Sequence, residues 1–478
     1  MMLAVQRLKG AAIWRGFVAL LIIVPLLTIG PIARQSVTAA PLSPRHLNVW
    51  PTTGSVNWAN ASIFWFGKAT ENDNYVDVRV AYDSQNLYVF ATIVDYYLWF
   101  DPTGAADPRT YDALAVYLNT AGVRATAPQA TDYFFVSGFR VGTTASSLYQ
   151  RQGQGSGSGW NENWSPSPAW SDNVAGRWYT SGPNNNSDRD AGWATTLTIP
   201  WATLGRSGPP AAGATWGLGT ILYDRDNQPP NGTVPNEYWP EAMDPSTPAT
   251  WGQIAFNPAN YQPPASRNDQ TIVIRRGLNA NFVQDAYAGG GGTCGGGIFG
   301  GGDVPHPTDN LFVQNEADVS DFPCFSKSYL KFDLSAIPAG KVIQSAKLTI
   351  YQFGGSNSQN APTSDVQVFS VQDPWDETTL TWNNAPLATE NYPGASVAPM
   401  TTPLVWPGIP ITWDVTPIVA DAYQAGQPAS LALYSADTGY NSGKYFVSSD
   451  AQDWDANGRP TLTITYGDHV VFLANVSH

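Results

Sequence analysis

The sequence predicts an all-β protein made of two β-sandwich (jelly-roll-like) modules in tandem. Short runs of β-branched and aromatic residues recur along the chain, with Gly, Pro and Asn turns between them. This pattern is typical of sandwiches and jelly rolls. A Pro-rich break at 257–270 divides the chain, and Pro-rich linkers act as semi-rigid spacers. We therefore expect modules at 47–258 and 270–467, held apart by a linker at 259–269.

Residues 1–39 are predicted to be a signal peptide. Arg7, Lys9 and Arg15 precede the apolar run 17–29, and small residues follow this run. This is the order of a secretory leader. The run is short for a bilayer span, although a retained signal anchor is the alternative. Because no later segment is long and apolar enough to cross a membrane, we expect a secreted, extracellular protein, with the cell envelope as an alternative location.

The charge of the chain restricts its partners. The formal charge is −14, and it becomes −18 once the four basic residues of the leader region (Arg7, Lys9, Arg15, Arg34) are removed. Nucleic acids and anionic lipid surfaces require basic patches, so both are disfavoured. An anionic polysaccharide would need locally clustered Lys and Arg or bridging calcium. A neutral glycan meets no such barrier, while the sequence leaves the oligomeric state open.

The first half begins with a hairpin signal. Val78, Val80 and Tyr82 alternate, and the turn 83–86 leads into the apolar run 87–94. This predicts a half-buried strand paired with a central one. The same reasoning predicts further strands at 113–118, 133–137, 194–199, 216–223 and 251–256.

The second half repeats this pattern and adds one helix. Strands are expected at 329–334, 342–353, 365–371, 411–415, 430–434, 444–448 and 461–466. Thr416 is a suitable N-cap with Pro417 at the first helical position, and Gly426 ends the helix. The residues after Gly467 (468–478) form a C-terminal tail with a short apolar strand at 470–473.

The two cysteines, Cys294 and Cys324, are predicted to form one disulfide. They follow an export signal, and an even pair in an oxidising compartment most simply pairs. The loop of about 30 residues would stabilise the fold by about 3 kcal/mol. The Gly-rich tract 289–302 is read as a loop tied down by Cys294, because it lacks the strand and helix of a phosphate-binding motif.

At these strands the first half resembles the family 9 carbohydrate-binding module, a β-sandwich related to the DOMON fold. The likeness rests on four segments in the right order: VRVAYDSQNLYVFATIVD from Val78, YDALAVYLN from Tyr111, TLTIPWATLG from Thr196 and TWGQIAF from Thr250. The resemblance implies sugar binding between two aromatic residues. One is expected just before the Asp that opens a strand, where Tyr111 stands, and the other near Tyr238 and Trp239.

The second half resembles the DNRLRE-type module, which includes the family 96 carbohydrate-binding modules. The matches are SYLKFDLSAIPAGKVIQSAKLTIY from Ser328, DPWDETTLTWNNAP from Asp373, WDVTPIVADAYQAG from Trp413 and RPTLTITYG from Arg459. The resemblance implies an extracellular jelly-roll module, one of a type appended to many kinds of secreted protein.

Tryptophan supplies the candidate sugar site. Thirteen of the nineteen indoles lie between Trp50 and Trp251, and an indole face can stack on the C–H face of a pyranose. Indoles within strand motifs are assigned to the core, namely Trp193, Trp201, Trp216 and Trp251. Those in polar loops, Trp99, Trp160, Trp164, Trp170 and Trp239, are either ligand platforms or loop anchors. The predicted carbohydrate-binding residues are Trp99, Arg109, Tyr111, Asn236, Glu237 and Trp239.

Calcium is the one cofactor that the sequence suggests. Asp224, Asp226 and Asn227 place oxygen donors in one loop, the ligand type that Ca²⁺ prefers, although EF-hand spacing is absent. Asp95 is read as a turn residue or a further calcium ligand. Haem is disfavoured because the first half offers Met243 but only His46 as axial ligands.

These observations favour a non-catalytic protein that binds neutral polysaccharide or cell-surface glycan. One alternative is a structural or adhesion protein of the cell envelope, with the sandwich folds but no sugar site. It predicts that Trp99 and Trp239 are buried, with no groove between them. The other is an unrecognised or accessory glycan-degrading enzyme, since carboxylate pairs are plentiful. The four histidines are scattered, which argues against a Ser–His–Asp site.

Overall fold

A computed structural model describes residues 44–70, 72–142, 146–178, 190–227, 236–280, 282–290, 302–308, 310–316, 325–356, 361–400, 405–439 and 441–470. The predicted signal peptide, both cysteines and most of the tail (471–478) lie outside these residues.

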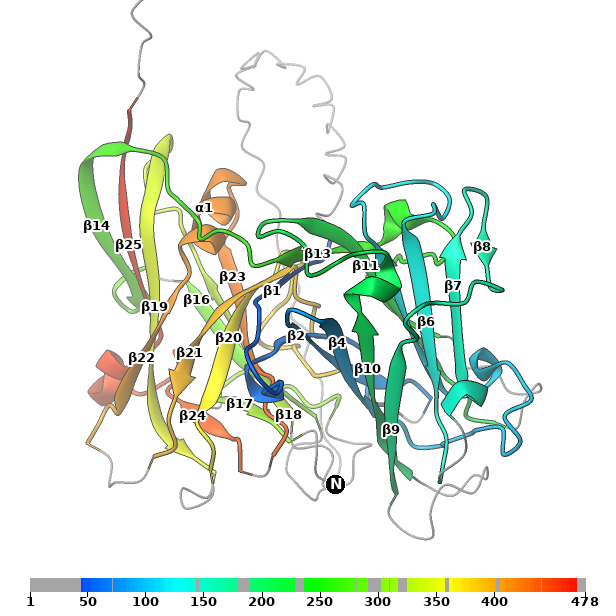
Figure 1. The fold of residues 1–478 in the computed structure, drawn as a ribbon. Helices are drawn as coiled ribbons and strands as arrows, with labels where there is room; N and C mark the ends of the chain where they lie inside the picture. Colours follow the sequence, from blue (N-terminus) through cyan, green and yellow to red (C-terminus); the bar gives the residue numbers. More distant parts are fainter. Residues whose placement is uncertain are drawn as a thin grey trace, which may run out of the picture. The chain divides into compact units, whose positions relative to one another are not determined.

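The first half is a sandwich of two sheets (Figure 1). One is the five-stranded antiparallel sheet β2-β3-β4-β10-β9. The other runs β1-β13-β11-β5-β6-β7-β8, with β12 also paired to β11. The strands are β1 (His46–Val49), β2 (Ser62–Gly67), β3 (Tyr75–Tyr82), β4 (Asn86–Val94), β5 (Ala113–Asn119), β6 (Asp132–Gly138), β7 (Gln150–Gly155), β8 (Trp160–Asn161), β9 (Ser171–Trp178), β10 (Asp190–Pro200), β11 (Thr215–Tyr223), β12 (Glu237–Trp239) and β13 (Gly252–Phe256).

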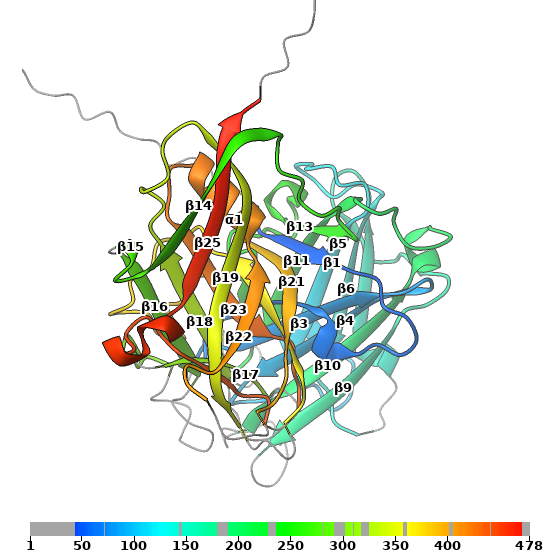
Figure 2. The ribbon, with the colours of Figure 1, turned by 90° about the vertical axis from the view of Figure 1, so that its left-hand side faces the viewer.

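The second half is also a sandwich. One sheet runs β14-β25-β19-β22, seen side by side in Figure 2, and β24 pairs with both β19 and β17. The other runs β16-β18-β23-β20-β21. The elements are β14 (Ser266–Arg276), β15 (Asn279–Ala280), β16 (Val283–Gly290), β17 (Leu311–Asn315), β18 (Phe325–Phe332), β19 (Lys341–Gly355), β20 (Ser364–Ser370), β21 (Glu390–Val397), β22 (Ile409–Asp414), α1 (Thr416–Gln424), β23 (Ala429–Ser435), β24 (Lys444–Phe446) and β25 (Thr461–His469).

Short 3₁₀ helices connect some of these strands. They are η1 (Trp58–Asn60), η2 (Pro108–Thr110), η3 (Ser146–Leu148), η4 (Trp201–Leu204), η5 (Pro248–Thr250) and η7 (Asp453–Gly458). Each sandwich encloses its own apolar core. The all-β fold class is confirmed, and the strands expected from alternation or from an apolar run between residues 78 and 466 are present. The short strand expected at 470–473 lies almost wholly outside the described residues.

The β3–β4 hairpin forms as its sequence indicates. Asp83 begins the turn, and its Oδ1 accepts hydrogen bonds from the backbone N–H groups of Gln85 and Asn86 at 2.7 and 2.8 Å. Tyr82 then faces Leu87 across the antiparallel pair. A short polar side chain that bonds the backbone in this way favours a turn over continued strand.

Helix α1 forms as predicted, but Val415 and not Thr416 is its N-cap, and its last residue, Gln424, lies two residues before Gly426. Thr416 opens the helix, and Asp414 Oδ1 accepts hydrogen bonds from its N–H and its hydroxyl. Beyond the last turn, Gly426 adopts a φ of 64°, in the left-handed region that glycine enters without strain. The Gln427 N–H then bonds the Ala422 carbonyl, which caps the C-terminus.

The two halves share a third apolar core. The outward faces of β2 and β3 supply Ile63, Trp65 and Tyr75, which cluster with residues of the second half such as Tyr329 and Trp382. Trp65 packs edge-on to Phe369 and Tyr434, with ring centroids 5.0 and 5.4 Å away. Residues 43–478 accordingly form one compact unit. The expectation that the linker holds the halves apart is therefore wrong.

The described strands also reach into two segments that the sequence assigned to the linker and tail. Strand β14 begins at Ser266, inside the predicted linker 259–269. Strand β25 continues through Asp468 to His469, so these two tail residues pair with the start of β14.

Candidate functional site

Three buried aspartates meet where β4 and β11 end. Asp95 directly follows β4, and Asp224 and Asp226 follow β11. One oxygen from each carboxylate lies within 4.8 Å of the others. Asp95 and Asp224 are fully buried, and Asp226 is 9% exposed. The fold therefore joins two members of the predicted calcium loop with Asp95, whereas the third predicted ligand, Asn227, is exposed.

The electrostatics of this cluster favour a bound cation. Burial, together with the charges of Asp95, Asp226 and Glu237, raises the pKa of Asp224 to about 9. Burial likewise raises the pKa of Asp95 well above its usual range. Both Asp224 oxygens and Asp95 Oδ2 have no hydrogen-bond partner among the described residues. Because buried carboxylates are normally paired or bound to metal, this all-oxygen set fits Ca²⁺.

A fourth carboxylate, Asp112, links this cluster to the predicted sugar residues. Its Oδ2 accepts a hydrogen bond from the backbone N–H of Trp99 at 2.5 Å, and its Oδ1 accepts one from the backbone N–H of Arg225 at 2.8 Å. Burial, and after it the charges of Asp95 and Asp224, raises the pKa of Asp112 well above its usual value.

Arg225 brings two of the predicted residues together. Its Nη1 donates to Asn236 Oδ1 at 3.2 Å, and its Nη2 donates to the Arg109 carbonyl at 3.1 Å. The sequence reasoning missed both Asp112 and Arg225. Arg225 stands between Asp224 and Asp226 in the sequence, and this position next to the predicted calcium ligands could have identified it as a residue of the site.

The guanidinium of Arg109 is already engaged by carboxylates. It forms ion pairs with Asp107 at 2.6 Å and with Glu162 at 2.8 Å. Its carbon lies 5.8 Å from the centre of the Phe134 ring. A sugar hydroxyl would therefore compete with two charged acceptors for Arg109. Tyr111 is half-buried directly after η2.

Trp239 is a core residue, which corrects its assignment as a sugar platform. It is 2% exposed, and its ring centroid lies 4.2 Å from that of Phe64. The reason is local: Trp239 is the last residue of β12, which pairs with β11, so the indole points into the sandwich. Trp99 is half-buried, and its Nε1 has no partner among the described residues.

Glu237 lies instead in a polar pocket of about 420 Å³ with residues of the second half, here called the junction pocket. It is lined by Gly67, Lys68, Glu237, Tyr238, Glu241, Asp373, Pro374, Asn383, Asn384, Ala385, Pro386 and Leu387. Buried Arg45 ties two of these acids together by ion pairs with Glu241 and Asp373. Burial, and after it the charge of Asp73, raises the pKa of Glu237 to about 7.

The chemistry of the junction pocket suits an uncharged, hydroxyl-rich ligand. Carboxylates accept hydrogen bonds, Lys68 donates them, and the amides of Asn383 and Asn384 do both. Tyr238 adds a half-buried aromatic face beside them.

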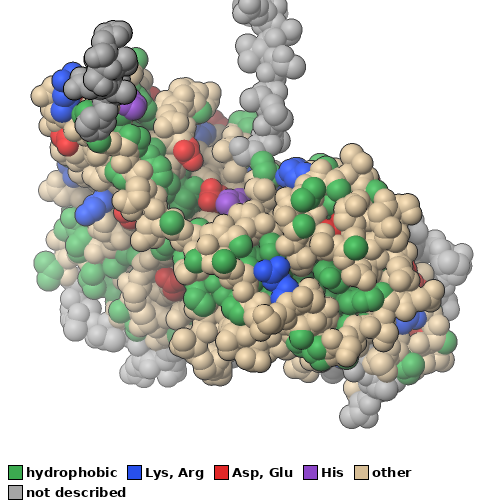
Figure 3. Space-filling view, turned by 45° about the horizontal axis from the view of Figure 1, so that its top comes forward, with side chains coloured by type: hydrophobic (Ala, Val, Ile, Leu, Met, Phe, Trp, Pro, Cys, Tyr) green, Lys and Arg blue, Asp and Glu red, His purple; other side chains and the backbone are tan. Residues whose placement is uncertain are grey.

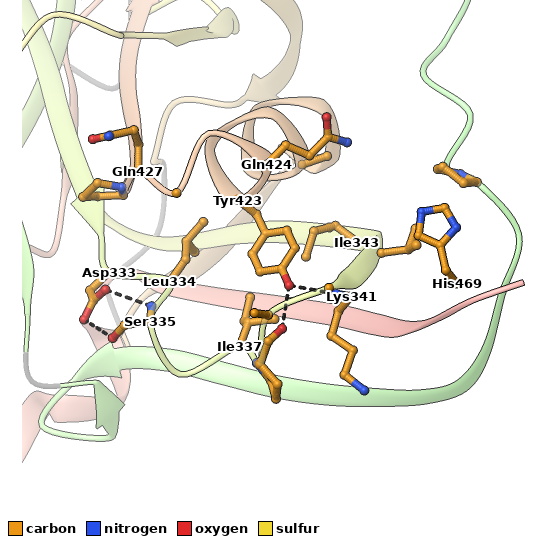
Figure 4. A pocket seen from close by; sticks show the side chains of 18 of the residues that line it. Asp333, Leu334, Ser335, Ile337, Lys341, Ile343, Tyr423, Gln424, Gln427 and His469 are labelled. Carbon is orange, nitrogen blue, oxygen red and sulfur yellow. Dashed lines mark hydrogen bonds between the residues drawn. The ribbon is translucent and has the colours of Figure 1, made fainter. Parts of the chain in front are cut away.

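A second pocket, of about 970 Å³, lies in the second half between α1 and the start of β19 (Figure 4). Tyr423 projects into it from α1. Its hydroxyl accepts from the Lys341 N–H at 2.9 Å and donates to the Pro338 carbonyl at 2.5 Å. None of the predicted site residues lines this pocket.

No helix in the described part of the chain is long and apolar enough to cross a membrane.

Solved structures and one family model match parts of this chain. Similar solved structures include a family 9 carbohydrate-binding module of Caldicellulosiruptor kristjanssonii in complex with cellotriose (12% identity, 45% of this chain and 95% of that chain covered, TM-score 0.32). The same description applies to a glucose complex (12% identity, 45% and 97% covered, TM-score 0.31). No curated protein matches. Residues 307–466 match carbohydrate-binding module family 96, as the motifs of the second half predicted.

Proposed function

We propose that this protein is a secreted, non-catalytic carbohydrate-binding protein that binds a neutral polysaccharide or a cell-surface glycan. The observation that carries the proposal is the match of residues 307–466 to a carbohydrate-binding module family. The junction pocket supports it, because its acids, amides and Lys68 can satisfy the hydroxyls of a sugar.

A neutral ligand is favoured by the distribution of charge. The chain carries a formal charge of −14, which repels anionic polymers. On the face shown in Figure 3, Lys and Arg side chains are few and scattered. Within the junction pocket, Glu237, Glu241 and Asp373 outnumber Lys68.

Calcium is part of the proposal as a structural ion. Asp95, Asp224 and Asp226 would hold it, and its charge would offset three buried carboxylates. Through Asp112 and Arg225, the bound ion would also fix the loops that carry Trp99, Arg109 and Asn236.

The direct test is affinity electrophoresis of the full chain through gels that contain glucan, xylan or mannan, followed by calorimetry with the matching oligosaccharides. We expect retardation by at least one neutral polymer. The paired variant Glu237→Gln/Tyr238→Ala should weaken it, whereas Asp333→Asn, which removes a carboxylate from the other pocket, should not. Absence of retardation by every polymer would contradict the proposal.

The adhesion alternative is favoured by one observation, the burial of Trp239 in the core. It predicts that the full chain binds none of the glycans while remaining folded. Reducing-sugar release from the same polymers would instead reveal an enzyme.

A further inference from the structure

Two tryptophans of the second half stand out by their exposure. Trp406, three residues before the start of β22, is 52% exposed, and Trp454 in η7 is 68% exposed. Ten other tryptophans are at most 9% exposed. Exposure of an apolar indole to water is unfavourable, and most tryptophans of this chain avoid it by packing in a core. A contiguous group of exposed indoles therefore indicates a binding surface.

These two indoles are one end of a continuous row of aromatic rings, here called the aromatic row. Successive centroids are 5.5, 5.9, 6.5 and 4.8 Å apart, in the order Trp454, Trp406, Phe353, Tyr445 and Phe312. Trp406 and Phe353 lie nearly parallel, at 17°. The pairs at either end are close to perpendicular, at 78° and 79°.

The sheet builds the row by register. Phe312 on β17 directly faces Tyr445 on β24, and Phe353 lies at a bulge of β19 against the same strand. Alternation buries the neighbours Leu311, Gln352 and Phe446 and turns the ring-bearing residues outward.

Glycine keeps the row continuous. Gly354 faces Tyr445 across the strands, and a Cβ at Gly354 would lie 3.1 Å from the Tyr445 ring. Any larger residue there would displace the ring.

We propose that the aromatic row binds an extended neutral glycan chain, with several sugar units stacked along it. The inference rests on the proposed function and adds a second site, separate from the junction pocket. All five residues of the row fall inside the range that matches a carbohydrate-binding family. The exposed indoles of Trp406 and Trp454 can stack on the C–H faces of pyranoses, and the half-buried rings beyond them extend the apolar surface along which further units of a chain can lie.

Charge at the row points to a neutral glycan and away from an anionic membrane or polymer. Arg459, the residue after η7, is neutralised by an ion pair at 3.0 Å with Asp453, the residue before Trp454. The Trp454 Nε1 donates to Gln452 Oε1 at 3.1 Å, so a polar amide borders the exposed ring. Membrane-binding surfaces combine exposed indoles with unpaired basic residues.

The test compares variants of the full chain by calorimetry and by tryptophan fluorescence, with cello-, xylo- and manno-oligosaccharides of two and six units. We expect the wild type to bind a hexasaccharide more tightly than the corresponding disaccharide. Trp406→Ala/Trp454→Ala should lower affinity for the hexasaccharide about tenfold, which equals about 1.4 kcal/mol, and reduce the dependence on length. Phe282→Ala, which removes a ring that is 48% exposed and outside the row, is the matched control.

The outcomes separate the two proposals. If the wild type binds no glycan, the proposed function fails. If Trp406→Ala/Trp454→Ala binds as the wild type does while Glu237→Gln/Tyr238→Ala loses affinity, only the aromatic row is refuted. If Phe282→Ala weakens binding equally, the loss is not specific to the row and the inference fails. Circular dichroism and the urea midpoint of each variant show that the fold is kept.

Discussion

Asp285 is an ionisable residue buried within β16. It is 1% exposed, and its two oxygens accept from the Ser449 N–H at 2.8 Å and the Ser449 hydroxyl at 3.0 Å. Burial, supplemented by the charges of Asp450 and Glu377, raises its pKa to about 7. Its pKa in the unfolded chain is about 4. The folded state therefore binds more protons than the unfolded state between these two values.

This difference predicts a pH-dependent stability. The contribution of Asp285 is fully present below about pH 4 and is lost as the pH rises through about 7. In Asp285→Asn, the free energy of unfolding should depend less on pH over this window. Urea denaturation between pH 4.5 and 8 measures the slope. Asp453→Asn, which changes a side chain that is 99% exposed, should keep the wild-type slope, and equal slopes in all three proteins would contradict the assignment.

Trp239 and Trp406 give a matched pair for the energetics of an indole. Trp239→Ala removes a ring that is 2% exposed and should lower the free energy of unfolding by about 3–5 kcal/mol. Trp406→Ala removes a ring that is 52% exposed and should change it by about 0.5 kcal/mol or less. Urea denaturation of both variants tests this, and equal losses would mean that Trp239 is not a core residue.

The same two tryptophans show a property that the sequence did not predict, namely which indole is buried. Trp239 and Trp406 both directly precede proline, and the neighbours of the buried Trp239 (NEYWPE) are more polar than those of the exposed Trp406 (PLVWPG), so local sequence does not predict which of the two is buried. Register decides: Trp239 ends a strand whose partner aims it into the core, while Trp406 precedes a strand on an outer face. Asp224 and Asp226 were predictable as neighbours, but their contact with Asp95 arises only when the ends of β4 and β11 meet.

At the scale of elements, strands with clear alternation or an apolar run were predictable, and polar strands were not. Strand β7 reads QRQGQG and shows neither pattern. Its glycines serve packing: a Cβ at Gly153 would lie 2.3 Å from the Phe134 ring, and one at Gly155 would lie 2.1 Å from the Gln129 carbonyl. Strand β2 reads SIFWFG, an apolar run from which it was predictable although it was not assigned; both of its faces are buried, one in the first-half core and one in the shared core.

The ends of β4 and β11 carry the calcium prediction. A cation bound by Asp95, Asp224 and Asp226 would bind the folded chain but not the unfolded one, so it should raise stability. At a calcium concentration of 100 times the Kd, the gain is about 2.7 kcal/mol. Thermal unfolding in EDTA and in increasing CaCl₂ measures it.

Asp224→Asn should abolish the response to calcium, while Asp453→Asn should retain it. A wild-type melting temperature that is identical in EDTA and in CaCl₂ would remove calcium from the proposal.

For the molecule as a whole, the decisive feature is a lysine buried between the halves. Lys327 of β18 is 1% exposed, and its Nζ lies 3.6–5.2 Å from the ring centres of Trp65, Tyr75, Trp382 and Tyr434. It donates to the Tyr75 hydroxyl at 3.1 Å. Burial lowers its pKa well below the usual value, and the charge of Asp77 opposes that shift.

Asp77 extends this cage into a network that spans the halves. Its Oδ2 accepts from Tyr434 at 2.9 Å and from Asn315 at 2.8 Å, and its Oδ1 accepts from Tyr75 at 2.5 Å. Nearby, Arg79 donates to the carbonyls of Ala436 and Asp437. Buried polar groups tolerate little displacement, because an unmatched partner costs free energy.

These contacts predict that the halves unfold together. The wild type should show a single cooperative transition in calorimetry, although each half has its own core. Lys327→Ala leaves a cavity among four rings and removes the donor to the Tyr75 hydroxyl, at a cost of about 3–5 kcal/mol. Because the loss falls on the shared core, the variant should show two separated transitions. Lys347→Ala, at an exposed position of β19, should unfold as the wild type does.

Two transitions in the wild type would mean that the shared core couples the halves weakly. An unfolding profile of Lys327→Ala that matches that of Lys347→Ala would exclude Lys327 as the coupling residue.

The coupling of the halves also affects glycan binding. The junction pocket is assembled from both halves, so Lys327→Ala should weaken binding there even though Lys327 does not line the pocket. The aromatic row lies wholly in the second half and should keep its affinity in the same variant, which calorimetry with a hexasaccharide on the folded protein would measure.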